Sequence, residues 1–441
     1  MFKYVLKRLG LSVIILLGVS IIIYFLVRLM PTDYLETKFS AQIQQGTITL
    51  EQLDEFKKRY GLYMPDAYLD ITINDGTVSD VKFSKDVKSQ SHTNLENGII
   101  SHAEFYAGTY TGDRDNLYLE LKTDNTFRVY EKVDDEKVSI LTGLFSADNG
   151  GFSMQVVQTN STCTVDAEYR VARFFDKFSA VLSGYFTWLG NMLRGDLGNS
   201  FIYQQPVGKV IADHMWISFI ISLVALVFQF AISIPLGITS ATHQYSIADY
   251  SVTIITMIGI SLPSFFFAAL LIKIFSSWLG WFPAFGLVTG GAATEGIAHL
   301  FDMLHHLVLP MIVLVVLSIG GLMRYTRTNM LEVLNSDYIR TARSKGLSEK
   351  KVIYVHAFRN TMIPLMTLLA GILPSLFGGA MITEEVFAID GIGRLAYKAL
   401  QQGDVPFIMG YNMFLAVLTV IGTLMSDLMY AVVDPRVKLS K

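Results

Sequence analysis

Apolar and polar residues follow two different patterns along this chain, and the changes from one pattern to the other divide it into regions. A first apolar run, Leu9–Met30, is long enough at 1.5 Å per residue to cross a hydrocarbon layer about 30 Å thick. Between residues 70 and 175 apolar residues instead recur at every second position, as in Leu117–Leu121 and Thr126–Tyr130. From Phe174 onward long apolar runs return. Alternation with a period of two predicts strands, and long apolar runs predict membrane helices.

The apolar runs predict six membrane-spanning helices. The first follows Lys3, Lys7 and Arg8 and ends before Pro31, and it has no cleavage site of small residues, which favours a retained helix over a signal peptide. Proline and glycine inside several later runs predict kinked helices around a cavity. The five later runs are Trp216–Ala241, Tyr250–Trp278, His306–Met323, Thr361–Thr383 and Ile408–Val432.

Four regions follow from these patterns. They are residues 1–30, the first membrane helix; 31–69, an external segment with an amphipathic stretch at Thr49–Tyr60; 70–175, a β-rich domain; and 176–441, a five-helix membrane domain. Turn-forming sequences separate the strands of the β-rich region, which predicts a small antiparallel domain, either a meander or a partly closed barrel. An external loop is a place where an inserted domain is tolerated.

The composition agrees with a membrane protein. Of 441 residues, 51% are hydrophobic and only 17% are charged, with a mean hydropathy of +0.42, whereas soluble domains carry about 25% charged residues. The net charge of −3 is unevenly distributed along the chain. Residues 70–175 hold 17 acidic and 10 basic residues, whereas the remainder holds 21 acidic and 25 basic residues. Cys163 is the single cysteine, which excludes a disulfide within the chain.

The basic residues predict the orientation in the membrane. The segment Arg324–Arg359 carries eight Lys or Arg and three Asp or Glu, and such short basic loops lie on the cytoplasmic side. Six spans with a cytoplasmic N-terminus return the C-terminus, with Arg436, Lys438 and Lys441, to the same side, and they place the β-rich domain outside. The loop 242–249 should also be cytoplasmic but has no Lys or Arg.

The basic segment contains the most informative stretch, Asp337–Leu347. Its spacing is helical, and Gly346 permits a turn into a second short helix that begins near Ser348. A helix, a glycine and a second helix projecting from a membrane domain form a shape suited to docking into a groove on a soluble partner. The alternative is a solvated basic loop that only sets the topology.

This stretch resembles the coupling loop, or EAA loop, of permease subunits of binding-protein-dependent ABC importers. Arg340-Thr341-Ala342 stands where that family often has Glu-Ala-Ala, and Gly346 matches its glycine. Over residues 1–68 and about 176–441 the chain is similar to B-type permeases of oligopeptide, dipeptide and related nickel importers. The other matching segments are Tyr60–Leu62, Gly195–Gly198, Arg324 with Arg327, Met330–Leu334, His356–Asn360, Glu385–Phe387, Gly391–Gly393, Asp404–Pro406, Asp427–Tyr430 and Asp434–Arg436.

The resemblance implies an all-α membrane domain of six helices, similar to type I ABC importers, into which a small antiparallel β-domain is inserted after the first helix. It implies a bacterial plasma membrane protein that imports oligopeptides or dipeptides. The implied partners are a second homologous permease, two cytoplasmic ATPases, an extracytoplasmic peptide-binding protein and membrane lipid, with no nucleic acid. Two departures from the family, Thr32–Tyr34 and Asp390, lie on the expected outer side.

The resemblance also implies two groups of site residues. The first is the surface that contacts an ATPase, within the loop 324–360, and the second is a path for the substrate. The coupling residues are Tyr338, Arg340, Thr341, Ala342, Arg343, Lys345, Gly346 and Leu347. The substrate-path residues are Ser261, Pro263, Phe265, Gly378 and Gly379.

The sequence carries no enzyme motif. It lacks the glycine-rich nucleotide-binding loop, so ATP and Mg²⁺ are expected in partner subunits and this chain is expected to hold no cofactor and no metal. His299, His305 and His306 have no cysteine at ligand spacing, and we expect them to be structural rather than metal ligands. The absence of a series of intramembrane carboxylates argues against a proton-driven transporter. Import of nickel or another small solute, and a membrane sensor with a ligand-binding β-domain, stay open as alternatives.

Overall fold

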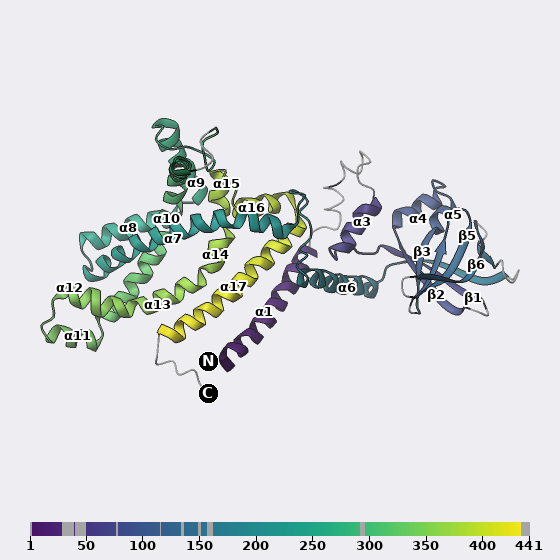
Figure 1. Cartoon of the computed structure of the whole chain (residues 1–441), viewed down its shortest axis with the longest axis horizontal. Coiled ribbons are helices and arrows are strands. Elements are labelled where there is room, and N and C mark those ends of the chain that lie inside the picture. The colour runs from purple at the N-terminus through teal and green to yellow at the C-terminus, as the bar shows by residue number, and fades with distance from the viewer. Residues whose placement is uncertain are drawn as a thin grey trace. The chain divides into compact units, whose positions relative to one another are not determined.

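The computed structural model describes residues 2–28, 39, 50–75, 78–114, 116–133, 136–148, 151–156, 162–291 and 296–433. They form two compact units, one of residues 1–34 with 191–441 and the other of residues 35–190 (Figure 1). The predicted departure at Thr32–Tyr34, the matching segment Asp434–Arg436 and the terminal Lys438 and Lys441 lie outside the described residues.

The β-rich region is a closed barrel of eight antiparallel strands in sequence order. The last strand pairs with the first over Ala67↔Val171 to Asn74↔Thr164. The barrel is therefore fully closed, whereas the sequence predicted a meander or a partly closed barrel. Closure satisfies the hydrogen-bonding groups that a free sheet edge would expose. The strands are β1 (Ala67–Asp75), β2 (Val78–Val87), β3 (Gly108–Gly112), β4 (Leu117–Leu121), β5 (Thr126–Val133), β6 (Glu136–Asp148), β7 (Gly151–Val156) and β8 (Thr162–Val171).

The alternation read from the sequence is the inside–outside pattern of this barrel. In β4, Leu117, Leu119 and Leu121 are buried, and the residues between them are only half-buried. Two short helices between β2 and β3, α4 (Ser89–Glu96) and α5 (His102–Tyr106), pack apolar residues against the same core. The fully buried residues include Leu69, Ile71, Ile73, Val81, Phe83, Tyr110, Leu119, Val129, Met154 and Val156.

Two helices complete this unit, α3 (Leu50–Arg59) and α6 (Phe174–Leu193). They meet at Gly61, where a Cβ atom would lie 2.1 Å from the carbonyl oxygen of Gly184. The backbone of Gly61 also has φ +67°, so only glycine fits there. This contact brings together the two segments between which the barrel is inserted.

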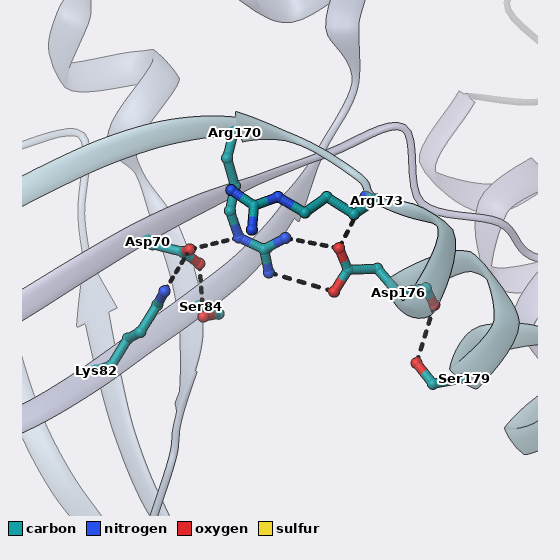
Figure 2. A network of polar contacts seen from close by, with 7 residues as sticks. All are labelled: Asp70, Lys82, Ser84, Arg170, Arg173, Asp176 and Ser179. Atoms are coloured by element: carbon teal, nitrogen blue, oxygen red, sulfur yellow. Dashed lines mark hydrogen bonds and ion pairs between the residues drawn. The ribbon is translucent and has the colours of Figure 1, made fainter.

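Arg170, at the end of β8, connects the barrel to α6 (Figure 2). Its Nε lies 2.7 Å from Oδ2 of Asp70 in β1, and its Nη1 lies 2.7 Å from Oδ2 of Asp176 in α6. Asp70 is 2% exposed and also accepts from Lys82 Nζ at 2.8 Å and from Ser84 Oγ at 2.7 Å. Burial raises the pKa of Asp70, but the hydrogen bonds from Lys82, Ser84 and Arg170 outweigh it and hold the pKa below its usual value.

The other unit is helical. Among the described residues, four helices are long and apolar enough to cross a membrane, and a bent pair makes up to five. The helices are α1 (Phe2–Arg28), α7 (Val207–Thr242), α8 (Ile247–Ser261), α9 (Ser264–Leu271), the π-helix η1 (Ile272–Trp278), α10 (Gly296–Leu334), α11 (Asp337–Ser344), α12 (Glu349–Lys351), the π-helix η2 (Val352–Ala357), α13 (Phe358–Gly371), α14 (Leu373–Gly378), α15 (Met381–Val386), α16 (Ile392–Gln402) and α17 (Val405–Val433).

Two of the predicted spans are not continuous helices. The run Tyr250–Trp278 bends by 102° between α8 and α9, where Pro263 has no backbone N–H to continue the helix. The run Thr361–Thr383 is divided among α13, α14 and α15, with a break at Gly379, whose φ is +74°. A count of six spans therefore stays a prediction.

The charge on Asp70 should stabilise the barrel, and the Asp70→Asn substitution tests this. Because the pKa of Asp70 is depressed in the folded state, its contribution is full above the unfolded carboxyl pKa of about 4 and is lost as the pH falls through the folded value. We expect Asp70→Asn to destabilise the barrel at pH 7 by roughly 3 kcal/mol, because its cationic partners would lose a buried charge.

Hydrogen exchange of β1 and β8 in the full-length protein in detergent measures this effect. Asp113→Asn, on the exposed surface of the same unit, is the matched control and should leave the exchange unchanged. Equal exchange in both variants would show that the Asp70 charge contributes nothing.

Candidate functional site

The predicted coupling stretch forms a short helix with two different faces. Helix α11 follows the end of α10, and its residues Ile339 and Ala342 are buried. They belong to a cluster, here called the anchor cluster, that contains residues of α7, α10, α11 and η2. Its buried members are Ile238, Ala241, Met330, Ile339, Ala342, Val352 and Ala357.

The opposite face of α11 is exposed and polar. Arg340, Thr341, Arg343 and Lys345 all lie in solvent, and Tyr338 is 48% exposed. The ion pair within α11, from Arg340 Nη1 to Asp337 Oδ1 at 3.6 Å, joins two well-exposed side chains and contributes little to stability. The exposed face therefore carries three cations, Arg340, Arg343 and Lys345.

Gly346 forms the turn after α11. Its φ is +74°, and its N–H donates to the carbonyl oxygen of Arg343 at 2.9 Å. No atom lies within 4 Å of an added Cβ, so backbone conformation rather than crowding requires glycine. Leu347 then turns back and packs against the anchor cluster.

An ion pair joins the helices on either side of this turn. Arg343 Nη2 lies 2.7 Å from Oε1 of Glu349, and Arg343 Nε donates to Oε2 at 3.3 Å. The hydrogen bond to Glu349 raises the pKa of Arg343, and the same bond lowers the pKa of Glu349. Both side chains are exposed, so the pair serves more to orient α12 than to stabilise the fold.

A buried polar network missed in the sequence lies beside the anchor cluster. Asp249, at the start of α8, accepts from Arg327 Nη2 of α10 at 3.1 Å, from the backbone N–H of Tyr245 at 3.0 Å, and from the Ser240 hydroxyl of α7. Three helices are thus tied together next to α11. Arg327 was among the matching residues, but no local pattern identifies Asp249 as its partner.

The predicted substrate-path residues fall into two groups. Ser261, Pro263 and Phe265 lie at the α8–α9 bend, where the Phe265 ring is largely exposed. Gly378 and Gly379 form the turn between α14 and α15, and Gly378 is buried. Helix α9 contacts α15, so the two groups lie on neighbouring elements. A substrate path along them stays a prediction.

The turn at Gly379 surrounds a buried carboxylate that the sequence patterns did not indicate. Glu384 accepts from Ser218 Oγ at 2.8 Å and from the N–H groups of Ala380 and Arg394 at 2.9 and 3.0 Å. A Cβ on Gly379 would lie 2.6 Å from Oε1 of Glu384. The glutamate thereby joins α15 to α7 and α16, and glycine is required because the carboxylate occupies the space of a side chain.

Comparison with known proteins identifies the family. The family of binding-protein-dependent transport system inner membrane components matches residues 233–439. The chain is 42% identical over 256 residues to the oligopeptide transport system permease protein AppB of Bacillus subtilis, covering 58% of this chain and 79% of AppB. It is 33% identical over 255 residues to the oligopeptide transport system permease protein OppB of Haemophilus influenzae, covering 58% of this chain and 79% of OppB. This chain belongs to the oligopeptide permease family.

A further relative agrees with this assignment. A putative peptide transport system permease protein of Brucella abortus is 39% identical over 251 residues, covering 57% of this permease and 78% of the relative. A solved inward-facing structure of the MetNI methionine ABC transporter covers 51% of this chain and 96% of its own at 16% identity, with a TM-score of 0.39. The family match includes α11 and Gly346 but none of the barrel strands.

The histidines of the permease make local contacts. His305 Nε2 lies 2.8 Å from the carbonyl oxygen of Trp281, and His306 Nδ1 lies 2.9 Å from that of Asp302. Within the described ranges no group of three or more His, Cys, Asp or Glu residues could hold a metal ion.

Shortening a buried side chain of α11 should weaken the packing of this helix against the anchor cluster. Ile339 is fully buried, so Ile339→Ala should weaken docking of α11 by about 2–4 kcal/mol. Faster hydrogen exchange across residues 337–347 would measure the detachment. Arg340→Ala, on the exposed face, is the control and should leave the exchange as it is; equal acceleration in both variants would contradict the anchoring role.

Proposed function

We propose that this permease subunit carries oligopeptides or dipeptides across the bacterial plasma membrane and couples that movement to separate cytoplasmic ATPases. The names of the relatives support peptides as the substrate class. The sequence has no glycine-rich nucleotide-binding loop, which supports placing ATP and Mg²⁺ in partner subunits. The proposed assembly also contains a second homologous permease and an extracytoplasmic peptide-binding protein.

The two-faced helix α11 is the observation that carries the proposal. At one end of its unit, α11 and α12 lie beyond the end of α10 (Figure 1). The exposed cations of α11 would contact an ATPase, and buried Ile339 and Ala342 contact the anchor cluster. Movement of the ATPase would therefore pass into α7 and α10 as a rigid-body rotation. The bonds from Arg327 and Ser240 to Asp249 would extend this movement to α8.

The coupling role predicts a specific effect at Gly346. Gly346→Pro would require φ near −65° where the turn has +74°, so α12 would be misdirected. We expect uptake of a labelled peptide to be abolished in cells while the amount of permease in the membrane is unchanged. Gly346→Asn is the matched control, because asparagine tolerates the left-handed conformation, and it should retain most uptake. Wild-type uptake by the proline variant would refute the coupling role.

The proposed orientation places α11 in the cytoplasm and the barrel outside. In a Cys163→Ser background, a cysteine introduced by Ser344→Cys should resist a membrane-impermeant maleimide in intact cells and react after permeabilisation. Lys122→Cys, on the exposed barrel surface, should react in intact cells. Reaction of Ser344→Cys from outside would overturn the orientation and the coupling role together.

For the barrel we propose a role in positioning the peptide-binding protein. Its ends are adjacent, because the N–H of Ala172 donates to the carbonyl oxygen of Asp66 at 2.9 Å. Residues 67–171 can therefore be replaced by a Gly-Gly linker that keeps Asp66 and Ala172 adjacent.

The excised variant should import normally when the loaded binding protein is saturating and several-fold more slowly when it is limiting. Peptide uptake in proteoliposomes over a range of binding-protein concentrations measures the difference. Equal uptake at every concentration would leave the barrel as a spacer.

A further inference from the structure

Helix α6 exposes a continuous apolar stripe. Phe174, Phe178, Leu182 and Phe186 follow one another at four-residue intervals, and each is exposed. Phe174 and Phe175, at the beginning of the helix, are 76% and 80% exposed. Tyr185 and Trp188, which border the stripe, are buried, and Gly184 meets Gly61. Single exposed apolar side chains are ordinary, but a stripe from Phe174 to Phe186 of one helix marks an interaction surface.

Polar residues lie on the side of α6 away from the stripe, so the helix suits an interface rather than the membrane interior. Asp176, Lys177, Ser183 and Thr187 lie away from the stripe. The helix is not among those apolar enough to cross a membrane. A helix of 20 residues with phenylalanine and leucine on one face and polar residues on the other has the form of one that lies in the membrane surface.

The chain after α6 indicates lipid as the occupant of the stripe. Ser200 is seven residues beyond Leu193, the end of α6, and its hydroxyl donates to Asp404. Asp404 accepts from the N–H of Phe407 at 3.3 Å and so caps the start of α17, one of the apolar membrane helices. Seven residues span at most about 25 Å, so the end of α6 cannot leave the neighbourhood of the membrane boundary. Exposed Arg173 and Lys177 near its beginning complement anionic headgroups.

We propose that α6 lies in the bilayer surface with the stripe Phe174, Phe178, Leu182 and Phe186 in contact with lipid chains, and that Arg170 fastens the barrel to this helix. Figure 2 shows the contact: the Arg170 guanidinium lies between Asp70 of the barrel and Asp176 of α6 and pairs with both. The N–H of Arg173 donates to Asp176 at 2.8 Å and holds the first turn of α6 in place. The barrel is then held at the membrane surface rather than left on a free linker.

Fluorescence quenching in nanodiscs tests the lipid contact. In a Cys163→Ser background, Phe178→Cys and Leu182→Cys place a bimane label on the stripe of the full-length permease, and Thr187→Cys places it on the polar side. The quenchers are a nitroxide on the acyl chains of phosphatidylcholine and iodide in the water. We expect the nitroxide to quench the stripe labels several-fold more than the Thr187→Cys label, and iodide to show the reverse order.

Two outcomes would overturn the proposal. Quenching of the stripe labels by iodide would show that the stripe is in water, and quenching by neither agent would show that another protein surface covers it. Resistance of the barrel to protease in each variant confirms that the fold is intact. The measurement needs no transport, so its failure would leave the coupling role of α11 unaffected.

Discussion

The burial of Ile339 and Ala342 against α7, α10 and η2 is the contact on which the structure of α11 depends. A helix of eight residues is too short to be stable alone, so α11 exists because one face is packed. The same packing leaves the cations of the other face pointing into solvent. One hydrophobic contact thus both forms the helix and fixes which of its residues face solvent.

Buried carboxylates perform a second structural task where the helices of the membrane unit are interrupted. Asp249 lies at the α7–α8 connection, Glu384 at the α14–α15 turn and Asp404 before α17, and each accepts at least three hydrogen bonds. A buried charge is costly unless its oxygens are satisfied, so each carboxylate requires its donors to stay in place. The irregular segments therefore have defined conformations although they are not helical.

The barrel uses the same device at its junction with α6, and its closure explains how the chain accepts it. Because β1 pairs with β8, the barrel begins and ends at one place, and the flanking segments meet through Gly61 and Gly184. The inserted unit needs no contact with the rest of the permease to complete its core. Arg170 joins the barrel to α6 by pairing with a carboxylate on each side.

The sequence by itself determined which segments are apolar helices and which are strands, because periods of 3.6 and 2 are local properties of neighbouring residues. It also identified α11, Gly346 and the family, since these depend on residue types at fixed spacing. Tertiary structure alone decided that β8 returns to β1 and that Asp249 and Glu384 are buried. Each of these depends on atoms brought together from distant parts of the chain, such as Arg327 with Asp249 and Ser218 with Glu384. Periodicity within a segment contains no information about such partners.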